Sequence, residues 1–334
     1  MKRVALITGI TGQDGSYLAE SLLEKGYEVH GVVRRAAITD QTVRIGRIQH
    51  ICDRCILHEA SVENYGSMFR IVEIVKPDEC YHLAAQSFVG ASFEDAHSTL
   101  SINIFGTLNL LTAVRDVVPK CRVYFAASSE MFGKVVESPQ NELTRFIPMS
   151  PYGVSKVAGY DLTRQFREAY DMFACSGILF NHESPRRGME FVTRKISMGA
   201  ARIKAGLTHT LELGNLAARR DWGHSREYVE AMWLMLQADK PDDFVIATGE
   251  THSVQDFCQA AFAELDLDWK EYVVSSEAFK RPSDVELLLG DASKANAALG
   301  WRPEITFNAL VKEMVAADYA AVREEVLLKR EELR

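Results

Sequence analysis

The sequence predicts an α/β protein with a doubly wound parallel sheet, followed by a smaller, mixed α/β part. Short apolar, strand-like runs alternate with amphipathic helical stretches from the N-terminus to position 180. A glycine turn separates the first strand from its helix, and a dense polar loop at 181–188 ends the alternation. We therefore expect one domain over residues 1–180 and a second over 181–334. A segment near 220–250 is expected to return to the first domain, so that the two are partly interleaved.

The first βα unit carries the clearest signal. Residues 3–8 form an apolar run of the type buried in parallel sheets, residues 16–25 form an amphipathic helix, and residues 28–33 form the next strand. Glycines between strand and helix permit a tight turn and a close backbone approach, and the helix N-terminus attracts a pyrophosphate. The spacing G-x-x-G-x-x-G in this context predicts a Rossmann-type dinucleotide site. Its predicted residues are Gly9, Thr11, Gly12, Gln13, Asp14 and Gly15.

The residues at the end of the second strand indicate whether the dinucleotide is NAD or NADP. An NAD site usually places an acid there for the ribose 2′-hydroxyl, but here Arg34 and Arg35 follow the strand and the first acid is Asp40. A pair of guanidinium groups suits a 2′-phosphate, which favours NADP. The alternatives are a solvated basic loop and a loop that contacts a neighbouring subunit.

Further βα units extend the predicted sheet. We expect helices over 61–75, 99–117 and 151–170, and strands over 79–83, 122–127 and 173–180. Ligands of open α/β sheets bind at the carboxyl ends of the strands, so the segments that follow two of these strands are candidate site residues. They are the small-residue loop Leu83, Ala84, Ala85, Gln86 and Ser87, and the polar pair Ser128 and Glu130.

Tyr152 and Lys156 are four residues apart, which places both on one face of the predicted helix. A phenol with its ordinary pKa of about 10 is a poor base at neutral pH, and a neighbouring ammonium lowers that pKa. Such a phenol can take a proton from an alcohol while hydride leaves the same carbon. Because Y-x-x-x-K is common by chance, an exposed lysine and an interfacial tyrosine are the alternative interpretation.

Charge and composition exclude several classes of partner. The net charge of −8 argues against nucleic acid or an anionic membrane as the main partner, and no apolar run approaches the roughly 18 residues of a membrane span. The N-terminus begins directly with a strand, without a signal peptide, so we expect a cytoplasmic protein with reduced cysteines. His50, Cys52, Cys55 and His58 suggest zinc, but the sequence has no second C-x-x-C, and we expect no metal.

Several longer runs resemble one protein family. The chain is similar to extended short-chain dehydrogenase/reductases, and within them to the GDP-mannose 4,6-dehydratase family. The two most specific runs are 181–188 and 247–254, which are far more specific than the glycine turn. The matching runs are 5–18, 82–87, 128–133, 150–156, 179–188, 191–196, 220–224, 247–254 and 281–282.

The resemblance implies a lyase that converts GDP-mannose to GDP-4-keto-6-deoxy-mannose and water with tightly bound NADP. It implies that Tyr152 accepts the 4-hydroxyl proton while NADP+ takes hydride from C4. Glu130 would then remove the C5 proton, which the 4-ketone has acidified. Assisted by Ser128, Glu130 would pass a proton to the departing 6-hydroxyl, and the stored hydride would return to C6. A second acid/base at the sheet edge is what a dehydratase needs and a plain dehydrogenase does not.

The resemblance also implies roles for binding residues. Lys156 would orient the nicotinamide ribose and tune Tyr152, and the chain would form a homodimer or homotetramer. The loop Leu83, Ala84, Ala85, Gln86 and Ser87, together with His182 and Arg187, would contact the cofactor. The substrate would be held by Ser87, Glu130, Asn181, Lys195, Arg220 and Arg281. Surface salt bridges are the alternative interpretation of the arginines.

Some positions depart from the family pattern, and other functions share much of it. The departures are Ala36, Ala37, Ser61, Ser98 and Asp284, which lie at the adenosine end and at the substrate rim. A dehydratase of a related nucleotide sugar, such as a GDP-linked heptose, would keep the same residues. An NADPH-dependent 4-reductase or an epimerase would not need Glu130. A regulatory NADP-binding protein without catalysis would not need the set Ser128, Glu130, Tyr152 and Lys156.

Overall fold

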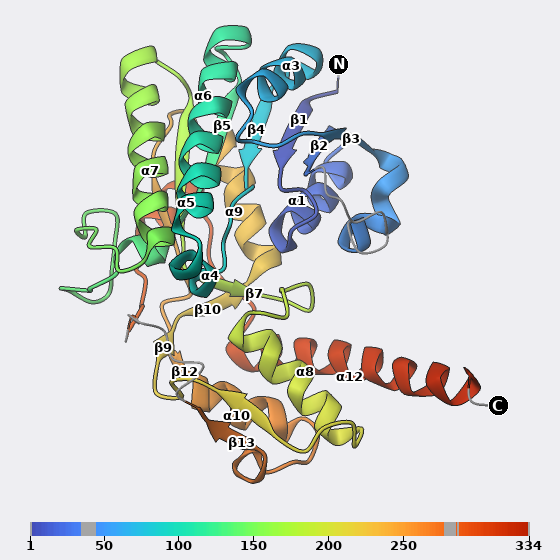
Figure 1. Ribbon diagram of the computed structural model, residues 1–334. Coiled ribbons are helices and arrows are strands. Elements are labelled where there is room, and N and C mark those ends of the chain that lie inside the picture. Colours follow the sequence, from blue (N-terminus) through green and yellow to red (C-terminus); the bar gives the residue numbers. More distant parts are fainter. Residues whose placement is uncertain (1, 35–44, 277–284, 286, 333–334) are drawn as a thin grey trace.

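The predicted parallel sheet is present in the computed structural model, which describes residues 2–34, 45–276, 285 and 287–332. Its strands stand in the order β3–β2–β1–β4–β5–β6–β11, and every neighbouring pair is parallel (Figure 1). This order is that of a doubly wound sheet with one strand added beyond β6. The strands are β1 (Val4–Thr8), β2 (Glu28–Val33), β3 (Cys55–Glu59), β4 (Glu79–His82), β5 (Arg122–Ser128), β6 (Ala174–Leu179) and β11 (Phe244–Ile246).

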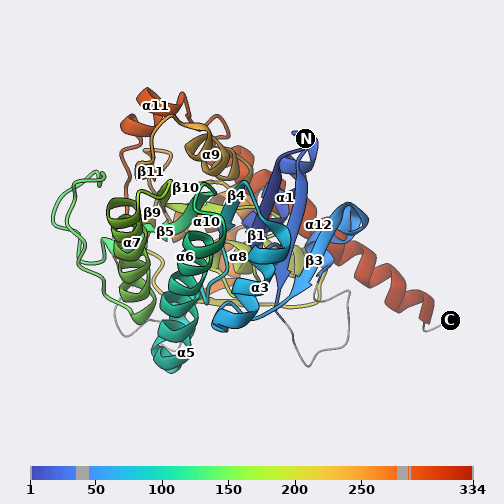
Figure 2. The ribbon, with the colours of Figure 1, turned by 90° about the horizontal axis from the view of Figure 1, so that it is seen from above.

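Helices cover both faces of this sheet (Figure 2). Because parallel strands are buried on both sides, each face needs an apolar helix layer. One layer is formed by α3 (Tyr65–Val75), α6 (Gly106–Val117) and α7 (Pro151–Tyr170). The other is formed by α1 (Gln13–Glu24), α9 (Ser225–Gln237) and α11 (Ser293–Leu299). The short segments η1 (Gly46–Arg54), α4 (Val89–Glu94), α5 (Ala96–Leu100) and η3 (Ser129–Met131) connect these elements.

The smaller part lies below the carboxyl edge of the sheet (Figure 1). It has its own apolar core, in which the aromatic rings of Trp222, Phe257 and Phe307 pack against one another. Its helices are α8 (Val192–Lys204), α10 (Val254–Ala263), η4 (Trp269–Glu271) and α12 (Phe307–Glu332). Its strand pairs are β7 (Asn181–Glu183) with β10 (Trp222–His224), β9 (Arg219–Arg220) with β12 (His252–Ser253), and β8 (Leu211–Leu213) with β13 (Val273–Ser275). Within the described ranges, no helix is at once apolar and long enough to span a bilayer.

The predicted boundaries are close for strands and less so for helices. The helix predicted from residue 61 begins at Tyr65, because the side chain of Asn64 accepts a hydrogen bond from Ser67 N (2.8 Å) and caps it there. The C-terminal helix α12 begins at Phe307. One face of its first half is buried: Leu310, Val311 and Met314 belong to the core of the smaller part.

The helix predicted over 99–117 is present and ends at Val117 as expected, but a π-helical turn, η2 (Ser101–Phe105), interrupts it between α5 and α6. A π turn inserts one residue into the helical repeat and rotates the side chains that follow. Here the turn carries the buried side chain of Asn103, which makes hydrogen bonds to two other segments of the site described below.

A buried ion pair joins α12 to the loop after β7. Asp318 is fully buried, and its carboxylate accepts hydrogen bonds from Arg194 Nε (2.9 Å) and Ser197 Oγ (2.6 Å) of α8. Arg194 in turn donates to the carbonyl oxygens of Pro185 and Arg187. The C-terminal helix therefore fixes the loop that continues from β7.

Replacing Asp318 by Asn tests this anchor. Arg194 would keep its charge in a largely buried place without a carboxylate, which typically costs on the order of 3 kcal/mol. We expect urea unfolding of Asp318→Asn to occur at a clearly lower denaturant concentration than that of the wild type. Glu325→Gln on the same helix removes an ion pair that is about one-third exposed on both sides, and it serves as the control. Equal midpoints for the two variants would contradict a stabilising role of the buried pair.

Candidate active site

A cavity of about 560 Å³ lies at the carboxyl ends of β1, β4 and β5. Every cofactor residue predicted from the sequence that the structure describes lines it. Arg35 lies outside the described residues. These lining residues are Gly9, Thr11, Gly12, Gln13, Asp14, Gly15, Arg34, Leu83, Ala84, Ala85, Gln86, Ser87, Tyr152, Lys156, His182 and Arg187.

The glycine turn forms one wall of this cavity by close backbone contact. Gly9 has φ +78°, and a Cβ there would lie 2.8 Å from the backbone nitrogen of Ala84. A Cβ on Gly15 would lie 2.3 Å from the carbonyl oxygen of Gly9. Thr8 Oγ1 accepts a hydrogen bond from Ala84 N (3.2 Å) and contacts His82 Nδ1 (2.8 Å), so the loop after β4 is fixed against the turn. A ligand can come close to the backbone of this turn only because its glycines carry no side chains.

Ser128, Glu130, Tyr152 and Lys156 all line the same cavity. Ser128 ends β5, and its hydroxyl accepts a hydrogen bond from Glu130 N (3.2 Å). Ser150 caps α7 by accepting from Gly153 N (3.0 Å), and Pro151 occupies the first helical turn. Strand end and helix start thus bring together four polar side chains that the sequence separates.

Burial governs the proton affinities of this group. It raises the pKa of Tyr152 to about 12, with the hydroxyl of Ser128 lowering the pKa and the charge of Glu130 raising it. Burial also lowers the pKa of the Lys156 ammonium to about 8. The pKa of Tyr152 is therefore not lowered in the polypeptide alone, because burial is the largest influence on it. The amine of Lys156 donates a hydrogen bond to the carbonyl oxygen of Ala126 (2.6 Å). Desolvation of the Tyr152 phenol outweighs the influence of this amine on the pKa of the phenol.

Asp14 connects three elements beside the glycine turn. Its carboxylate contacts His182 Nε2 of β7 (2.8 Å), and it accepts hydrogen bonds from Ser225 Oγ of α9 (2.7 Å) and from the Gln13 amide (3.1 Å). Burial raises its pKa, but the charge and hydrogen bonds of its partners prevail and hold it well below its ordinary value. Gln13 also donates to the carbonyl oxygen of His182 (3.0 Å) and accepts from Ser184 Oγ (2.8 Å).

Asn103 was not predicted as a site residue. Its amide accepts from Gln86 N (2.8 Å) and donates to Gln86 O (3.1 Å) and Ser155 Oγ (2.8 Å). It thereby holds the loop after β4 against the helix that carries Tyr152 and Lys156. Nothing in the sequence distinguished it, because the same helical run also contains the polar residues Ser101, Thr107 and Asn109.

Arg47 and Glu63 also line the cavity without having been predicted. Arg47 Nε donates to the carbonyl oxygen of Arg186 (2.7 Å), and Nη1 donates to that of Thr11 (3.4 Å). Glu63 accepts from Ser61 Oγ (3.2 Å) and Ser101 Oγ (3.0 Å). An acid two residues beyond Ser61 therefore occupies the end of the cavity at which Ser61 departs from the family pattern.

The predicted substrate residues divide into two groups. Ser87, Glu130 and Asn181 line the cavity, and Asn181 Oδ1 is buried without a hydrogen-bond partner among the described residues. Lys195 on α8 and Arg220 on β9 do not belong to its lining. Arg281 lies outside the described residues.

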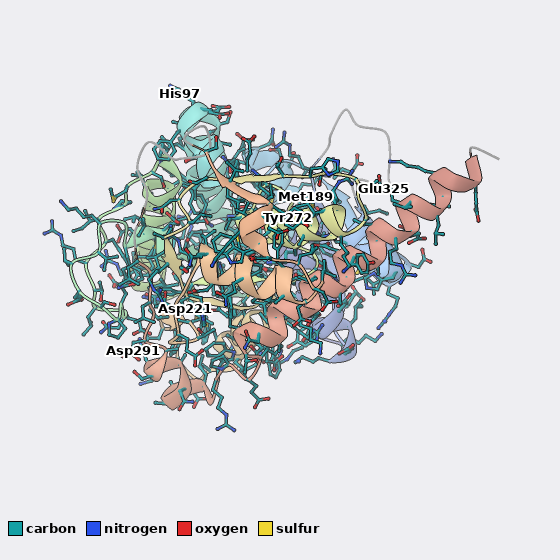
Figure 3. All side chains as sticks on the ribbon, turned by 90° about the horizontal axis from the view of Figure 1, so that it is seen from below. His97, Met189, Asp221, Tyr272, Asp291 and Glu325 are labelled. Atoms are coloured by element: carbon teal, nitrogen blue, oxygen red, sulfur yellow. The ribbon has the colours of Figure 1, made fainter. Side chains whose placement is uncertain are left out.

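Next to Arg220, the buried carboxylate of Asp221 organises the run at 247–250. It accepts hydrogen bonds from Thr248 N (2.9 Å), Gly249 N (2.9 Å) and Gly290 N (3.4 Å). Asp221 and Asp291 accordingly lie near each other, on the side of the molecule away from Glu325 and the end of α12 (Figure 3). The specific sequence run at 247–254 is thus held by Asp221 at its first half and by the pairing of β12 with β9 at its second.

The side chains considered for zinc point to other partners. His50 forms an ion pair with Glu20, while His58 Nε2 contacts His30 Nδ1 (2.9 Å). Burial raises the pKa of the Cys55 thiol to about 11, which disfavours the thiolate that zinc requires. Among the residues that the structure describes, no three His, Cys, Asp or Glu side chains converge as a metal site.

Replacing Gly15 by Ala tests the backbone contact in the turn. The added methyl group would meet backbone atoms at 2.3 and 2.7 Å, and such overpacking typically costs about 1–3 kcal/mol. We expect a lower thermal unfolding midpoint. Gly66→Ala in α3 is the matched control, because its nearest atom lies at 3.6 Å and alanine favours the helix by about 1 kcal/mol. A Gly15→Ala midpoint at or above the wild-type value would show that the turn has room for a side chain.

Comparisons with solved structures agree with this architecture. UDP-glucose 4-epimerase of Thermus thermophilus, in complex with NAD, superimposes with a TM-score of 0.82 at 26% sequence identity. The alignment covers 95% of this chain and 99% of that one. The doubly wound sheet with a smaller second part is therefore shared with this group of nucleotide-sugar enzymes.

Sequence comparisons are more specific. GDP-mannose 4,6 dehydratase 2 of Arabidopsis thaliana is 52% identical over 98% of this chain and 90% of that protein. GDP-mannose 4,6 dehydratase 2 of Caenorhabditis elegans is 50% identical over 96% of this chain and 90% of that protein. The family model described as GDP-mannose 4,6 dehydratase matches residues 6–314. The chain belongs to the GDP-mannose 4,6 dehydratase family.

Proposed function

We propose that this enzyme is a hydro-lyase that converts GDP-mannose to GDP-4-keto-6-deoxy-mannose and water with tightly bound NADP. The observation that carries the proposal is the presence of two acid/base side chains, Tyr152 and Glu130, in one cavity. Oxidation of an alcohol needs only the first. Removal of a proton from C5 and expulsion of the 6-hydroxyl need the second.

The residues present fit a nicotinamide dinucleotide. The glycine turn and the N-terminus of α1 line the cavity together, and the close backbone contacts of Gly9 and Gly15 form the tight strand-to-helix turn that a pyrophosphate site uses. Lys156 and Tyr152 lie at the other end of the same cavity, where the ribose and nicotinamide would be held. Bound there, the cofactor supplies a temporary acceptor for hydride and a positive charge that favours the phenolate of Tyr152.

Two side chains carry the proton transfers in this proposal. Tyr152 takes the proton of the sugar 4-hydroxyl, and Ser128, which hydrogen-bonds the phenol, assists Glu130. Glu130 takes the proton from C5 and delivers one to the 6-hydroxyl as it leaves as water, and C5 then regains a proton that balances the one taken up by Tyr152. Lys156 stays bound to the carbonyl oxygen of Ala126 and orients the ribose. The orphaned Asn181 Oδ1 accepts a hydrogen bond from a sugar hydroxyl.

The choice of NADP rests on the end of β2. Arg34 lines the cavity directly after β2, and the sequence holds no acid between Val33 and Asp40. A guanidinium group binds a 2′-phosphate by charge-assisted hydrogen bonds, whereas a carboxylate would bind the 2′-hydroxyl of NAD. Glu63 is placed to accept a hydrogen bond from the adenine amine. The homodimer or homotetramer and the division into 1–180 and 181–334 stay predictions.

Product formation without added reductant separates the candidate functions. Purified enzyme should convert GDP-mannose to a product lighter by one water, observed by mass spectrometry, with no NADPH supplied. A strict need for NADPH would instead indicate a 4-reductase, and an isomer of unchanged mass would indicate an epimerase. The same assay with a GDP-linked heptose tests the related dehydratase.

Substitution of Glu130 tests its place in the reaction. Glu130→Gln keeps the size of the side chain but cannot accept the C5 proton, so turnover should fall by a factor of order 10² or more. Dinucleotide binding, followed by fluorescence titration, should be unaffected. Glu137→Gln, an exposed residue outside the cavity, is the control. Turnover of Glu130→Gln equal to that of this control would remove Glu130 from the mechanism.

Substitution of Arg34 tests the choice of cofactor. A hydrogen bond to a charged group contributes about 1.5–3 kcal/mol, so Arg34→Gln should weaken NADP binding by about tenfold or more. The affinity for NAD, which lacks the 2′-phosphate, should change little. Equal losses for both dinucleotides would show that Arg34 does not read the 2′ position.

A further inference from the structure

Both ring nitrogens of His182 lie within hydrogen-bonding distance of an oxygen atom, one of a carbonyl group and one of a carboxyl group. Nδ1 lies 2.7 Å from the carbonyl oxygen of Phe180, and Nε2 lies 2.8 Å from Asp14 Oδ2. A neutral imidazole has one N–H and can donate to only one of them. If Asp14 is ionised, His182 must therefore carry both protons.

The partners of Asp14 favour its ionised form. Oδ1 accepts hydrogen bonds from Ser225 Oγ (2.7 Å) and Gln13 Nε2 (3.1 Å), while Oδ2 faces His182. Two donated hydrogen bonds and a position in the first turn of α1 stabilise the carboxylate. The second proton of the pair accordingly belongs to the imidazole.

The surroundings of His182 contain opposing influences. Burial and the charge of Arg187 disfavour an imidazolium, but the charge and hydrogen bond of Asp14 prevail, so the pKa of His182 is raised. The ring of Tyr228 stacks on the imidazole at 4.6 Å. The titratable groups around the ring are Asp14 of α1, Glu183 of β7, Arg187 of the following loop, His224 of β10 and Tyr228 of α9.

His224, a second buried histidine close by, shows the opposite arrangement. Its Nδ1 accepts a hydrogen bond from Arg226 N (3.0 Å), and its Nε2 lies 3.1 Å from Glu313. One acceptor and one donor nitrogen are what a neutral ring needs, and burial lowers its pKa. The double-donor geometry of His182 is thus specific to the cavity and is not a general property of buried histidines here.

We propose that His182 is a positioning residue: a buried imidazolium that locks β7 and its following loop to the glycine turn through Asp14. This inference rests on the dinucleotide site of the proposed function. Asp14 lines the cavity in which a pyrophosphate would lie, and an unpaired carboxylate there would repel that anion. The imidazolium cancels this repulsion and fixes the segment that supplies Asn181 and Arg187.

The ion pair of His182 and Asp14 forms only within a limited range of pH. Since the pKa of His182 is raised, its contribution is complete below the ordinary value of about 6.5 and is lost as the pH rises through the higher, folded-state value. Asp14, whose pKa is lowered, contributes above about 3.9 and loses its contribution only in stronger acid. NADP affinity should therefore fall on the alkaline side as His182 loses its proton.

Nitrogen-15 NMR of histidine-labelled wild-type enzyme tests the charge directly. We expect the ring nitrogens of His182 to show mainly the protonated shift at pH 6.5, where an ordinary histidine is half protonated. The exposed His97 of α5, which does not line the cavity, provides the reference signal (Figure 3). A spectrum in which His182 is mainly unprotonated at one ring nitrogen at pH 6.5 would overturn the proposal.

NADP titrations of variants test the positioning role. His182→Gln and Asp14→Asn should each weaken NADP binding by about tenfold and remove its alkaline pH dependence, and the double variant should lose less than the product of both. His97→Gln is the control and should bind as the wild type does. Multiplicative losses would show that the two residues act independently and contradict the proposed lock. If the wild type binds no dinucleotide, the proposed function fails, while the NMR spectrum still decides the charge of His182.

Discussion

The direct backbone contact between the glycine turn and the loop after β4 is the constraint on which the site depends. Gly9 lies against the backbone of Ala84, and Gly15 lies against Gly9, at distances that leave no room for a Cβ. β1 and β4 are paired strands, and this contact fixes the loop after β4 against the turn that leads into α1. The end of β5, with Ser128 and Glu130, then completes the same wall. A side chain at either glycine would separate the phosphate end of the cavity from its reactive end.

The sequence predicted the parts of the fold whose signals are local. The helix expected over 151–170 has these bounds because Ser150 and Pro151 are strong start signals, and the strand expected over 28–33 is likewise confirmed. The π turn could not be predicted, because it is stabilised by hydrogen bonds of Asn103 to segments far away in the sequence. Arg47 was missed for a similar reason: its role depends on its contacts with Thr11 and Arg186, not on a motif around it.

Proton affinity is the second property that the sequence could not supply. Spacing places Tyr152 and Lys156 on one helix face, but it does not tell how far each group is desolvated or where the ammonium points. In the structure both are buried, and the amine is bound to Ala126, so the phenol holds its proton more tightly than in water. Without a bound cofactor, Tyr152 therefore stays protonated and cannot yet act as a base. The positive charge of the proposed cofactor then becomes a condition for chemistry as well as a participant in it.

The added strand β11 has a consequence for biogenesis. It pairs with β6, although residues 180–243 separate the two, and Phe180 N donates a hydrogen bond to Ile246 O directly after β6. A ribosome therefore releases the first six strands while β6 still presents an open row of amide and carbonyl groups. Such an edge can pair with another nascent chain. Translation speed across residues 181–246 and access to chaperones during that interval thus govern the yield of folded enzyme.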